Sequence, residues 1–370
     1  MVIPPRKMTN KFSSLPMLRN LYLIPLISIT LSSCQKTENS PEQPYDKGVL
    51  VINSGNFFDN NGTLSLISRN SKIAASDIFQ KENNRSIAGG ITDYTEINEK
   101  GVILVDNSTD GKDVIEIVNA NTFKSIATIK GEIDNPRKVI KVSTNKAYIT
   151  CWDTFNADYT FKQGFVAVLD LVSNKILKKI PVNSGVEDII LIENLAFVGN
   201  VNALPTLQVI DIQKDEVKES IEIGTEPNNF VLDAANKIWM TAGNAIILFN
   251  PTTKLFEKKL NAGTNDKKLP NSLCISKDKK TLFYTYNFYD EADDYKLKGE
   301  ISTIDILSGT SKTFINRTFS SVDFDSESEI IYTSLIPSYK QSGYVYRYKT
   351  SGTMIDSVKT EIAPSKFYFK

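Results

Sequence analysis

Aromatic and polar side chains, rather than nucleophiles, are the residues of this sequence whose types and spacing could support a chemical function. They gather in two segments of 14 residues, 151–164 and 286–299, which also carry amides and carboxylates. Flat ring faces with polar neighbours suit a large, planar and partly polar ligand. The rings predicted to contact such a ligand are Trp152, Phe155, Tyr159, Tyr286, Phe288 and Tyr289. The same rings could instead pack the two segments onto the rest of the fold, and this alternative stays open.

Catalytic chemistry has little support in the sequence, which contains no histidine. Ser-His-Asp and Cys-His pairs and histidine-ligated zinc are therefore excluded. No GxGxxG, Walker, GxSxG or CxxC motif occurs, so nucleotide, acyl-transfer and thiol chemistry have no support either. The acidic run 290–294 lacks the alternating acids and the glycine of a calcium loop. We expect a protein that is not an enzyme, with no catalytic residue, metal or cofactor.

The charge balance argues against a nucleic-acid partner. The sequence has 43 basic and 43 acidic residues, but residues 1–33 contain four basic residues and no acid. The remainder therefore carries 39 basic and 43 acidic residues. A protein that neutralises several phosphates normally has a basic surplus.

The N-terminal segment 1–33 is predicted to be a lipoprotein signal peptide. A basic stretch precedes the apolar run 21–31, which is too short to span a bilayer core of about 30 Å. The following Leu31-Ser32-Ser33-Cys34 resembles the lipobox of bacterial lipoproteins, which implies cleavage before Cys34 and lipidation of its thiol. Residues 34–47 are polar and contain proline, as expected of a flexible tether. An ordinary signal peptide with an incidental cysteine is the alternative.

Short apolar or alternating runs, separated by turn residues, make up the chain from Gly48 onward. One strongly apolar run type recurs about every 45 residues. Its seven copies begin at residues 48, 101, 146, 195, 237, 281 and 330. Each is followed by a second apolar run and then by a more polar run rich in Lys and Glu, which is typical of an exposed edge strand. Seven similar units of three or four strands are therefore indicated.

A fourth run precedes each strongly apolar run except the first, and the missing copy lies at the other end of the chain. APSKFYF at 363 matches PRKVIKV at 136 and LPNSLCI at 269. The sequence thus predicts an all-β, seven-bladed β-propeller over residues 48–370, with four antiparallel strands per blade. The C-terminal strand should join the N-terminal blade and close the ring, which leaves no free sheet edge around it. Two β-sandwiches, the alternative, would explain neither the seven units nor the orphan strand.

The inner strands should begin at the mouth of the central channel, on the face where the two long segments emerge. Asn and Ser recur at this level and offer hydrogen-bond donors and acceptors to a ligand. The predicted contacts here are Asn135, Arg137, Asn228, Asn229 and Asn271. Strand capping and binding of channel water are the alternative roles. Cys151 and Cys274 should lie in blades three apart and form no disulfide.

The units resemble a known family. NKAYIT…GFVAVLDLVSNKILKKIPVNSG is similar to the units of YncE-like propellers, and GVLVINSGNFFDNNGTLSLIS behind a lipobox resembles the opening of BtuG-type cobalamin-binding surface lipoproteins. The resemblance covers nearly all of residues 48–370, but none of its ligand contacts can be matched to single positions.

The resemblance implies a lipid-anchored outer-membrane protein that captures a ligand on the loop face of the propeller and passes it to a TonB-dependent transporter. Cobalamin or another corrinoid is the implied ligand. Whether the protein faces the periplasm or the cell surface stays open. Two other functions also stay open, namely a propeller enzyme such as a lactonase or quinone-dependent dehydrogenase, and a protein-interaction scaffold.

Replacing Cys34 with alanine should abolish membrane retention, because the thiol would be the attachment point of the lipid. Fractionation of cells that express wild type and Cys34→Ala, with and without detergent, measures this. Continued membrane retention of the variant would contradict lipidation at Cys34.

Overall fold

The computed structural model describes residues 44–262 and 269–370. The predicted signal peptide, Cys34 and residues 35–43 of the predicted tether lie outside the described residues. Within the described part, no helix is both long and apolar enough to cross a bilayer. Tyr45 is only 2% exposed, its ring lies edge-on to Phe123, and its hydroxyl donates to Glu82. Packing against the propeller therefore begins at least three residues before Gly48.

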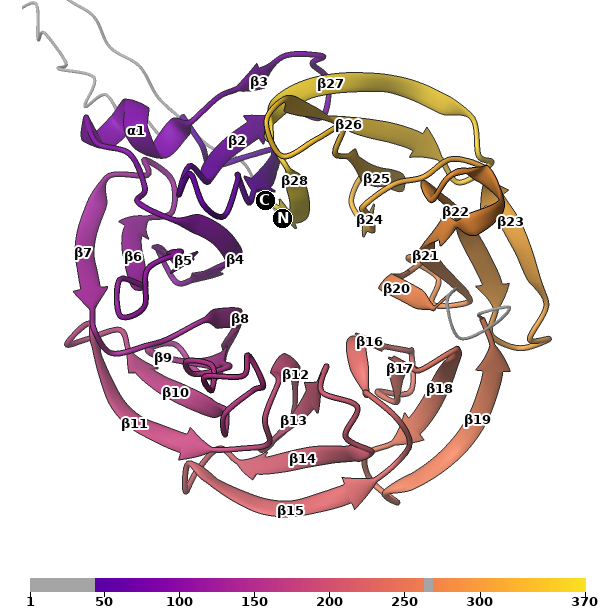
Figure 1. The fold of residues 1–370 in the computed structure, drawn as a ribbon, viewed down its shortest axis with the longest axis horizontal. Helices are drawn as coiled ribbons and strands as arrows, with labels where there is room; N and C mark the ends of the chain where they lie inside the picture. The colour runs from indigo at the N-terminus through magenta and orange to yellow at the C-terminus, as the bar shows by residue number, and fades with distance from the viewer. Residues whose placement is uncertain (1–43, 263–268) are drawn as a thin grey trace, which may run out of the picture. The chain divides into compact units, whose positions relative to one another are not determined.

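Seven four-stranded antiparallel sheets stand around a central channel and form a seven-bladed β-propeller (Figure 1), which confirms the predicted fold. We number the blades along the chain and name the strands of each blade inner, second, third and outer. Blade 1 consists of β28 (Pro364–Phe369), β1 (Val49–Asn53), β2 (Thr63–Ile67) and β3 (Ala74–Ala75). Blade 2 consists of β4 (Gly90–Ile97), β5 (Lys100–Asp106), β6 (Val114–Asn119) and β7 (Ser125–Lys130).

The other five blades follow in chain order with the same connectivity. Blade 3 is β8 (Pro136–Lys141), β9 (Lys146–Cys151), β10 (Phe165–Asp170) and β11 (Lys175–Pro181). Blade 4 is β12 (Val186–Ile192), β13 (Leu195–Asn200), β14 (Thr206–Asp211) and β15 (Glu216–Glu222). Blade 5 is β16 (Asn228–Leu232), β17 (Ile238–Ala242), β18 (Ala245–Asn250) and β19 (Leu255–Asn261). Blade 6 is β20 (Pro270–Ile275), β21 (Thr281–Asp290), β22 (Lys296–Asp305) and β23 (Ser311–Ile315). Blade 7 is β24 (Ser321–Asp325), β25 (Ile330–Leu335), β26 (Ser342–Lys349) and β27 (Met354–Ile362).

The hydrophobic core lies between neighbouring blades. Side chains alternate between the two faces of a strand, and each blade packs both faces against its neighbours, so the second and third strands are apolar at nearly every position. All five residues of β1 are buried, as are five of the six in β10. The outer strands face solvent and alternate instead, as in β15. Cys151 and Cys274 are free and buried in blades 3 and 6, three blades apart as predicted.

The ring closes by pairing of the two chain ends. Strand β1 pairs antiparallel with β28, with Val49 opposite Phe369 and Ile52 opposite Lys366, which confirms the predicted closure. The Ser54 amide adds a hydrogen bond of 2.8 Å to the carbonyl of Ala363. Blade 1 therefore takes its inner strand from the far end of the chain.

Two arginines hold blade 7 against blade 1 across this seam. The guanidinium of Arg347 pairs with Asp356 in its own blade at 2.6 Å, and both side chains are almost fully buried. Its remaining N–H groups donate to the carbonyls of Ser68, Arg69 and Ser71 in blade 1. Arg69 reaches back to Asp325 in blade 7 at 2.6 Å. The seam thus gains ion pairs where only the short link from β27 to β28 connects blade 7 to blade 1 along the chain.

The inner strands share a bulge at the channel mouth. In six of the seven blades, the register between the inner and second strands shifts near the start of the inner strand. Such a bulge redirects side chains, here at the positions that surround the channel mouth. Three of the side chains near the bulge bond to the next blade: Asp93 accepts the Val139 amide, Asp188 that of Phe230, and Ser272 that of Val322.

One predicted loop is a β-hairpin instead. The segment 286–299 continues strands β21 and β22, which stay paired from Tyr286 opposite Glu300 out to Asp290 opposite Lys296. Its tip is short and contains the 3-10 turn η1 (Glu291–Asp293). Alternating aromatic side chains favour the extended strand conformation, so a loop was the wrong expectation for most of this segment. A short helix, α1 (Ile78–Asn83), lies between β3 and β4 and buries Ile78 and Phe79.

Replacing Arg347 with methionine should lower the free energy of unfolding by about 3–5 kcal/mol, because Asp356 and three carbonyls would stay buried without their donor. Urea unfolding followed by circular dichroism measures this. The control is Lys277→Met, which breaks the exposed Lys277–Glu329 pair between blades 6 and 7 and should cost under about 1 kcal/mol. Equal losses of unfolding free energy in both variants would show that Arg347 stabilises the seam no more than an exposed ion pair does.

Candidate functional site

A pocket of about 510 Å³ opens at the channel mouth, across the seam. Five blades contribute to it: the β1–β2 loop and β28 of blade 1, β4 and β5 of blade 2, β8 of blade 3, β12 of blade 4 and the β25–β26 loop of blade 7. We call it the mouth pocket. Its side chains form a polar floor and an aromatic rim. The floor consists of Ser54, Thr92, Asp106, Arg137, Glu187, Ser365 and Lys366, and the rim of Phe57, Phe58 and Tyr339.

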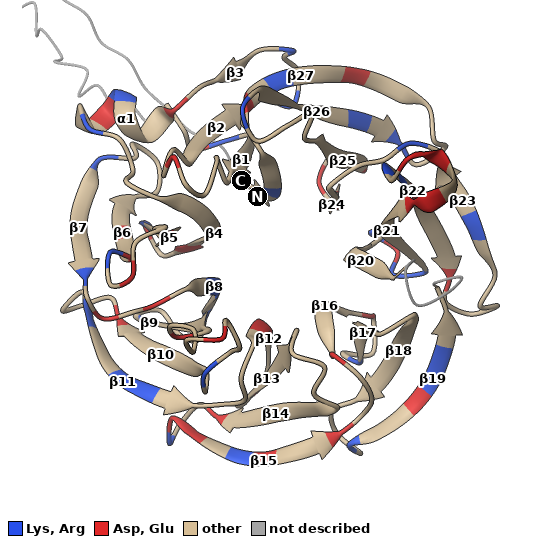
Figure 2. Ribbon diagram, viewed as in Figure 1, with Lys and Arg blue, Asp and Glu red and all other residues tan. Residues whose placement is uncertain are grey.

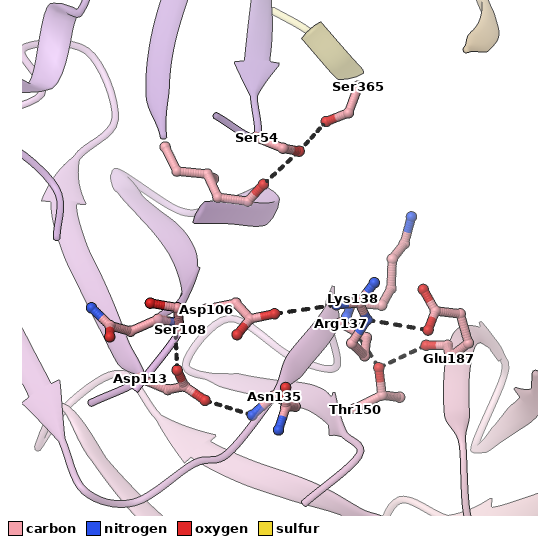
Figure 3. Close-up of polar contacts among 12 residues, drawn as sticks. Ser54, Asp106, Ser108, Asp113, Asn135, Arg137, Lys138, Thr150, Glu187 and Ser365 are labelled. Carbon is pink, nitrogen blue, oxygen red and sulfur yellow. Dashed lines mark hydrogen bonds and ion pairs between the residues drawn. The ribbon is translucent and has the colours of Figure 1, made fainter. Parts of the chain in front are cut away.

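The side chain of Arg137 is held in place at the pocket floor by neighbours from three blades (Figure 3). Its Nη1 lies 3.4 Å from Asp106 Oδ2 and its Nε lies 3.2 Å from Glu187 Oε2. The guanidinium also lies over the ring of Trp152, 4.0 Å from the centroid. Three neighbours from blades 2, 3 and 4 thus fix the orientation of one cation. Because its rotamer freedom is already restricted, binding a ligand there costs less entropy.

Two buried carboxyls behind Arg137 hold protons more tightly than free aspartate does. Burial raises the pKa of Asp106 to about 7, with a further contribution from Asp113, although the charge of Arg137 acts in the opposite direction. Burial also raises the pKa of Asp113 to about 6, against the amides of Asn107 and Asn135 that donate to it. The Asp106 side chain therefore changes charge near neutral pH, directly beside Arg137.

The rim is held by a tight turn after β1. The Asn56 amide donates to the side-chain oxygen of Asn61 at 2.6 Å. Gly55 has a φ of +78°, and a Cβ there would lie 2.6 Å from the Gly62 nitrogen, so the turn requires glycine. The Asn56 side chain also donates to the Tyr339 carbonyl, which ties the blade 1 loop to blade 7. Phe57 and Phe58 pack edge-on and stay exposed, Phe58 to 82%.

The predicted rings of the first long segment pack mainly against each other. The rings of Trp152 and Phe155 lie 6.2 Å apart, and Phe161 contacts both. Trp152 also supports Arg137, as described above, so it borders the floor from below. Tyr159 is 87% exposed at the tip of the segment. Local packing, the alternative role, thus accounts for Trp152 and for part of Phe155.

The predicted rings of the second segment lie on the extended hairpin of blade 6. Tyr286 and Phe288 stack at 6.5 Å, and burial raises the pKa of Tyr286 to about 12 beside Glu300. Tyr289 is 65% exposed. None of the six predicted rings lines the mouth pocket or the channel below it. Their contact with a ligand stays a prediction.

The predicted amides at the mouth mostly bond to the protein itself. The Asn135 side chain donates to the Asp153 carbonyl at 2.9 Å. The backbone carbonyl of Asn228 accepts from the Thr241 hydroxyl, whereas its side-chain Oδ1 is buried without a hydrogen-bond partner among the described residues. The Asn229 side chain donates to the same hydroxyl. Asn271 accepts the amide of Ser272. Of the five predicted mouth residues, Arg137 lines the mouth pocket and Asn229 lines the channel.

Several pocket residues were not among the predicted contacts. They are Thr92, Asp106, Glu187, Lys366, Phe57, Phe58 and Tyr339. A usable signal existed for Asp106, since Asn53, Asp106 and Asn200 each end an otherwise apolar second strand. For Tyr339 the sequence indicates a place in the equivalent loop of the seventh blade, on the same face, but its position beside the blade 1 loop follows only from closure of the ring. Among the described residues, no three His, Cys, Asp or Glu side chains are grouped to hold a metal ion.

Comparison with known proteins identifies the family. A family model described as a domain of unknown function, DUF5074, matches residues 47–369, so the chain belongs to this family. No curated protein matches the sequence. The comparison supports the propeller fold. It does not confirm the finer resemblance to YncE-like or BtuG-type proteins.

Solved structures share the fold at low sequence identity. A functionally unknown protein from Desulfotomaculum acetoxidans is 15% identical, with a TM-score of 0.62 over 87% of this chain and 98% of that chain. A quinoprotein alcohol dehydrogenase-like protein from Bacteroides thetaiotaomicron is also 15% identical, with a TM-score of 0.61 over 86% and 78%. Hydrazine synthase from Kuenenia stuttgartiensis is 12% identical, with a TM-score of 0.57 over 73% and 86%. These likenesses show the fold alone.

Replacing Asp106 with asparagine should flatten the pH dependence of stability. The folded pKa of about 7 exceeds the unfolded value of about 3.9, so the stability that Asp106 contributes is present below pH 4 and lost as the pH rises to 7. Asparagine does not titrate. Between pH 4 and pH 8, the free energy of unfolding of Asp106→Asn should therefore fall less than that of wild type, by on the order of 2–4 kcal/mol.

Urea titrations at pH 4, 6 and 8 measure this difference. Asp170→Asn is the control, because the hydroxyl and amide of Ser173 lower the pKa of Asp170 and its contribution is lost as the pH falls, not as it rises. Parallel pH curves for wild type and Asp106→Asn would contradict the raised pKa of Asp106.

Proposed function

We propose that this member of the DUF5074 family is a binding protein that holds a small molecule in the mouth pocket. The observation that carries the proposal is the fixed position of Arg137, which Asp106, Glu187 and Trp152 hold at the pocket floor. A structural arginine is usually covered by its partners, whereas this one lines an open pocket beside exposed rings. That arrangement favours a ligand that both parts of the pocket contact.

The pocket chemistry favours a partly polar molecule with a flat apolar face. Arg137 offers donors to carbonyl, carboxamide or carboxylate oxygens, and the neighbouring Glu187 offers acceptors. Because Arg137 lies between acidic partners, the floor has no strong net charge, so a highly charged ligand is disfavoured. Phe57, Phe58 and Tyr339 would cover the apolar face, and each Å² of ring surface buried contributes about 25 cal/mol. The exposed position of Phe58 leaves room for a ligand larger than the pocket itself.

A corrinoid such as cobalamin is the candidate ligand that the resemblance implies, and a flat, amide-bearing macrocycle fits this chemistry. The proposal includes the lipid anchor at Cys34, a location at the outer membrane and delivery to a TonB-dependent transporter. Catalysis is not part of it. Asp106, whose pKa burial raises to about 7, is only 7% exposed and lies against Arg137, so it is poorly placed to exchange protons with a ligand.

Alanine at Phe58 and glutamine at Arg137 should each weaken cobalamin binding by about 1–3 kcal/mol, because they remove a rim contact and the fixed donor. Titration followed by absorbance measures the affinity, with folding checked by circular dichroism. Tyr289→Ala is the matched control, since it removes an exposed ring outside the mouth pocket.

The outcomes separate the two predicted sites. Loss of binding in Tyr289→Ala with normal binding in Phe58→Ala would move the site to the blade 6 hairpin. Absence of saturable cobalamin binding to wild type would contradict the corrinoid, and co-purification of a transporter without any small ligand would then favour the scaffold function.

A further inference from the structure

The central channel forms a second cavity, below the mouth pocket, of about 400 Å³. All seven inner strands contribute side chains to it. It shares Ser365 and Lys366 with the mouth pocket, so the two cavities meet at the start of β28. We call it the channel cavity. Its charged groups all come from the inner strands, whereas those of the mouth pocket include Asp106 of β5.

Charged residues of both signs lie on the inner strands, with a blue segment on β8 and red segments on β12 and β24 in Figure 2. Those that line this cavity alternate in sign over five neighbouring blades. From blade 7 through blades 1 to 4, the inner strands carry in turn Asp323, Lys366, Asp93, Lys138 and Asp188. The remaining two blades carry the neutral polar residues Asn229 and Ser272. Two lysines thus stand between three aspartates, and Lys141 at the end of β8 adds a third lysine to the lining, so acidic and basic groups balance.

The charges of the arc are incompletely paired. Lys366 Nζ lies 3.5 Å from Asp93 Oδ1, a long contact. Asp188 and Asp93 accept backbone amides, so they also have a structural role. Lys138 Nζ forms no hydrogen bond or ion pair with any other described residue, and Asp323 accepts only the amide of the next residue, Phe324.

Lys138 and Asp323 nevertheless stay charged at neutral pH, and each affects the pKa of the other electrostatically. Asp93 raises the pKa of Lys138 more than burial lowers it, and Asp188 and Asp323 add to the effect. Burial raises the pKa of Asp323 to about 6, while Lys138 acts in the opposite direction. Two opposite charges therefore line one cavity of about 400 Å³ and form no hydrogen bond or ion pair with each other.

We propose that the channel cavity binds a small zwitterion of the α-amino acid type, with its carboxylate at Lys138 and its ammonium group at Asp323. The three N–H donors of Lys138 require acceptors, which a simple ammonium ion would not supply. A simple anion would in turn leave Asp323 without a cationic partner. A zwitterion leaves the net charge unchanged and satisfies both unpaired groups, and Asn229 and Ser272 offer hydrogen bonds to its side chain.

The inference goes beyond the proposed function, and its residues separate the two. Lys138 and Asp323 line the channel cavity and do not line the mouth pocket. Neither side chain makes an interblade hydrogen bond of the kind formed by Asp93 and Asp188, so substitutions at these two positions leave those contacts in place.

Isothermal titration calorimetry of the full chain tests the proposal with matched probes. L-Alanine and L-glutamine carry both charges, propionate carries only the carboxylate, and ethylammonium carries only the ammonium group. At least one zwitterion should bind saturably and at least tenfold more tightly than propionate and ethylammonium. Absence of binding by both amino acids, or equal binding of propionate or ethylammonium, would overturn the proposal and leave a channel that holds water or simple ions.

Substitutions then locate the site. Lys138→Met and Asp323→Asn should each weaken amino acid binding at least tenfold and leave cobalamin titration unchanged. Lys124→Met, which removes an exposed lysine outside both cavities, should bind as wild type does. Circular dichroism checks the fold of each variant. If both channel variants fold and bind the amino acid normally, the zwitterion lies elsewhere and the assignment to the channel cavity is wrong.

Discussion

The pairing of β28 with β1 is the interaction on which the rest of the structure depends. Six of the seven blades are built from consecutive strands, so covalent connection keeps each beside the next. Only blade 1 joins strands from opposite ends of the chain. If that pairing opened, blade 1 would lose its inner strand and the blades on either side would lose a packing face. The ion pairs of Arg347 and Arg69 lie at this seam, where β28 and the rest of blade 1 are held together by noncovalent contacts alone.

The central cavities follow from the same ring. Each inner strand places one edge toward the axis, and in six blades a bulge near the start of this strand redirects side chains at the mouth. Bonds from Asp93, Asp188 and Ser272 to the next blade fix the spacing of the inner strands. Arg137 is oriented only because blades 2, 3 and 4 converge on it. The position of the candidate ligand contacts is thus a property of the ring rather than of any single blade.

The fold could be predicted from the sequence because seven apolar runs and one orphan strand repeat in register. The site could be predicted only in part. Arg137 follows the repeat and was found, but the rings of Phe58 and Tyr339 come from blades 1 and 7 and meet only after closure. The hairpin around Tyr289 was not predicted, although aromatic residues alternate along the end of β21, because the facing residues 296–300 are mostly polar. Local patterns therefore identified the strands, whereas contacts between distant blades required the structure.

The hydrogen bond from the Asn56 side chain to the Tyr339 carbonyl spans the seam and also borders the mouth pocket. A ligand bound there would contact both the first and the last blade and would stabilise the closed ring. Its binding energy would then be linked to closure: at a concentration one hundred times its dissociation constant, a ligand stabilises the closed form by about 2.7 kcal/mol. Conversely, transient separation of blades 1 and 7 would weaken ligand binding. A transporter that pulled blade 7 away from blade 1 would therefore release the ligand without contacting it.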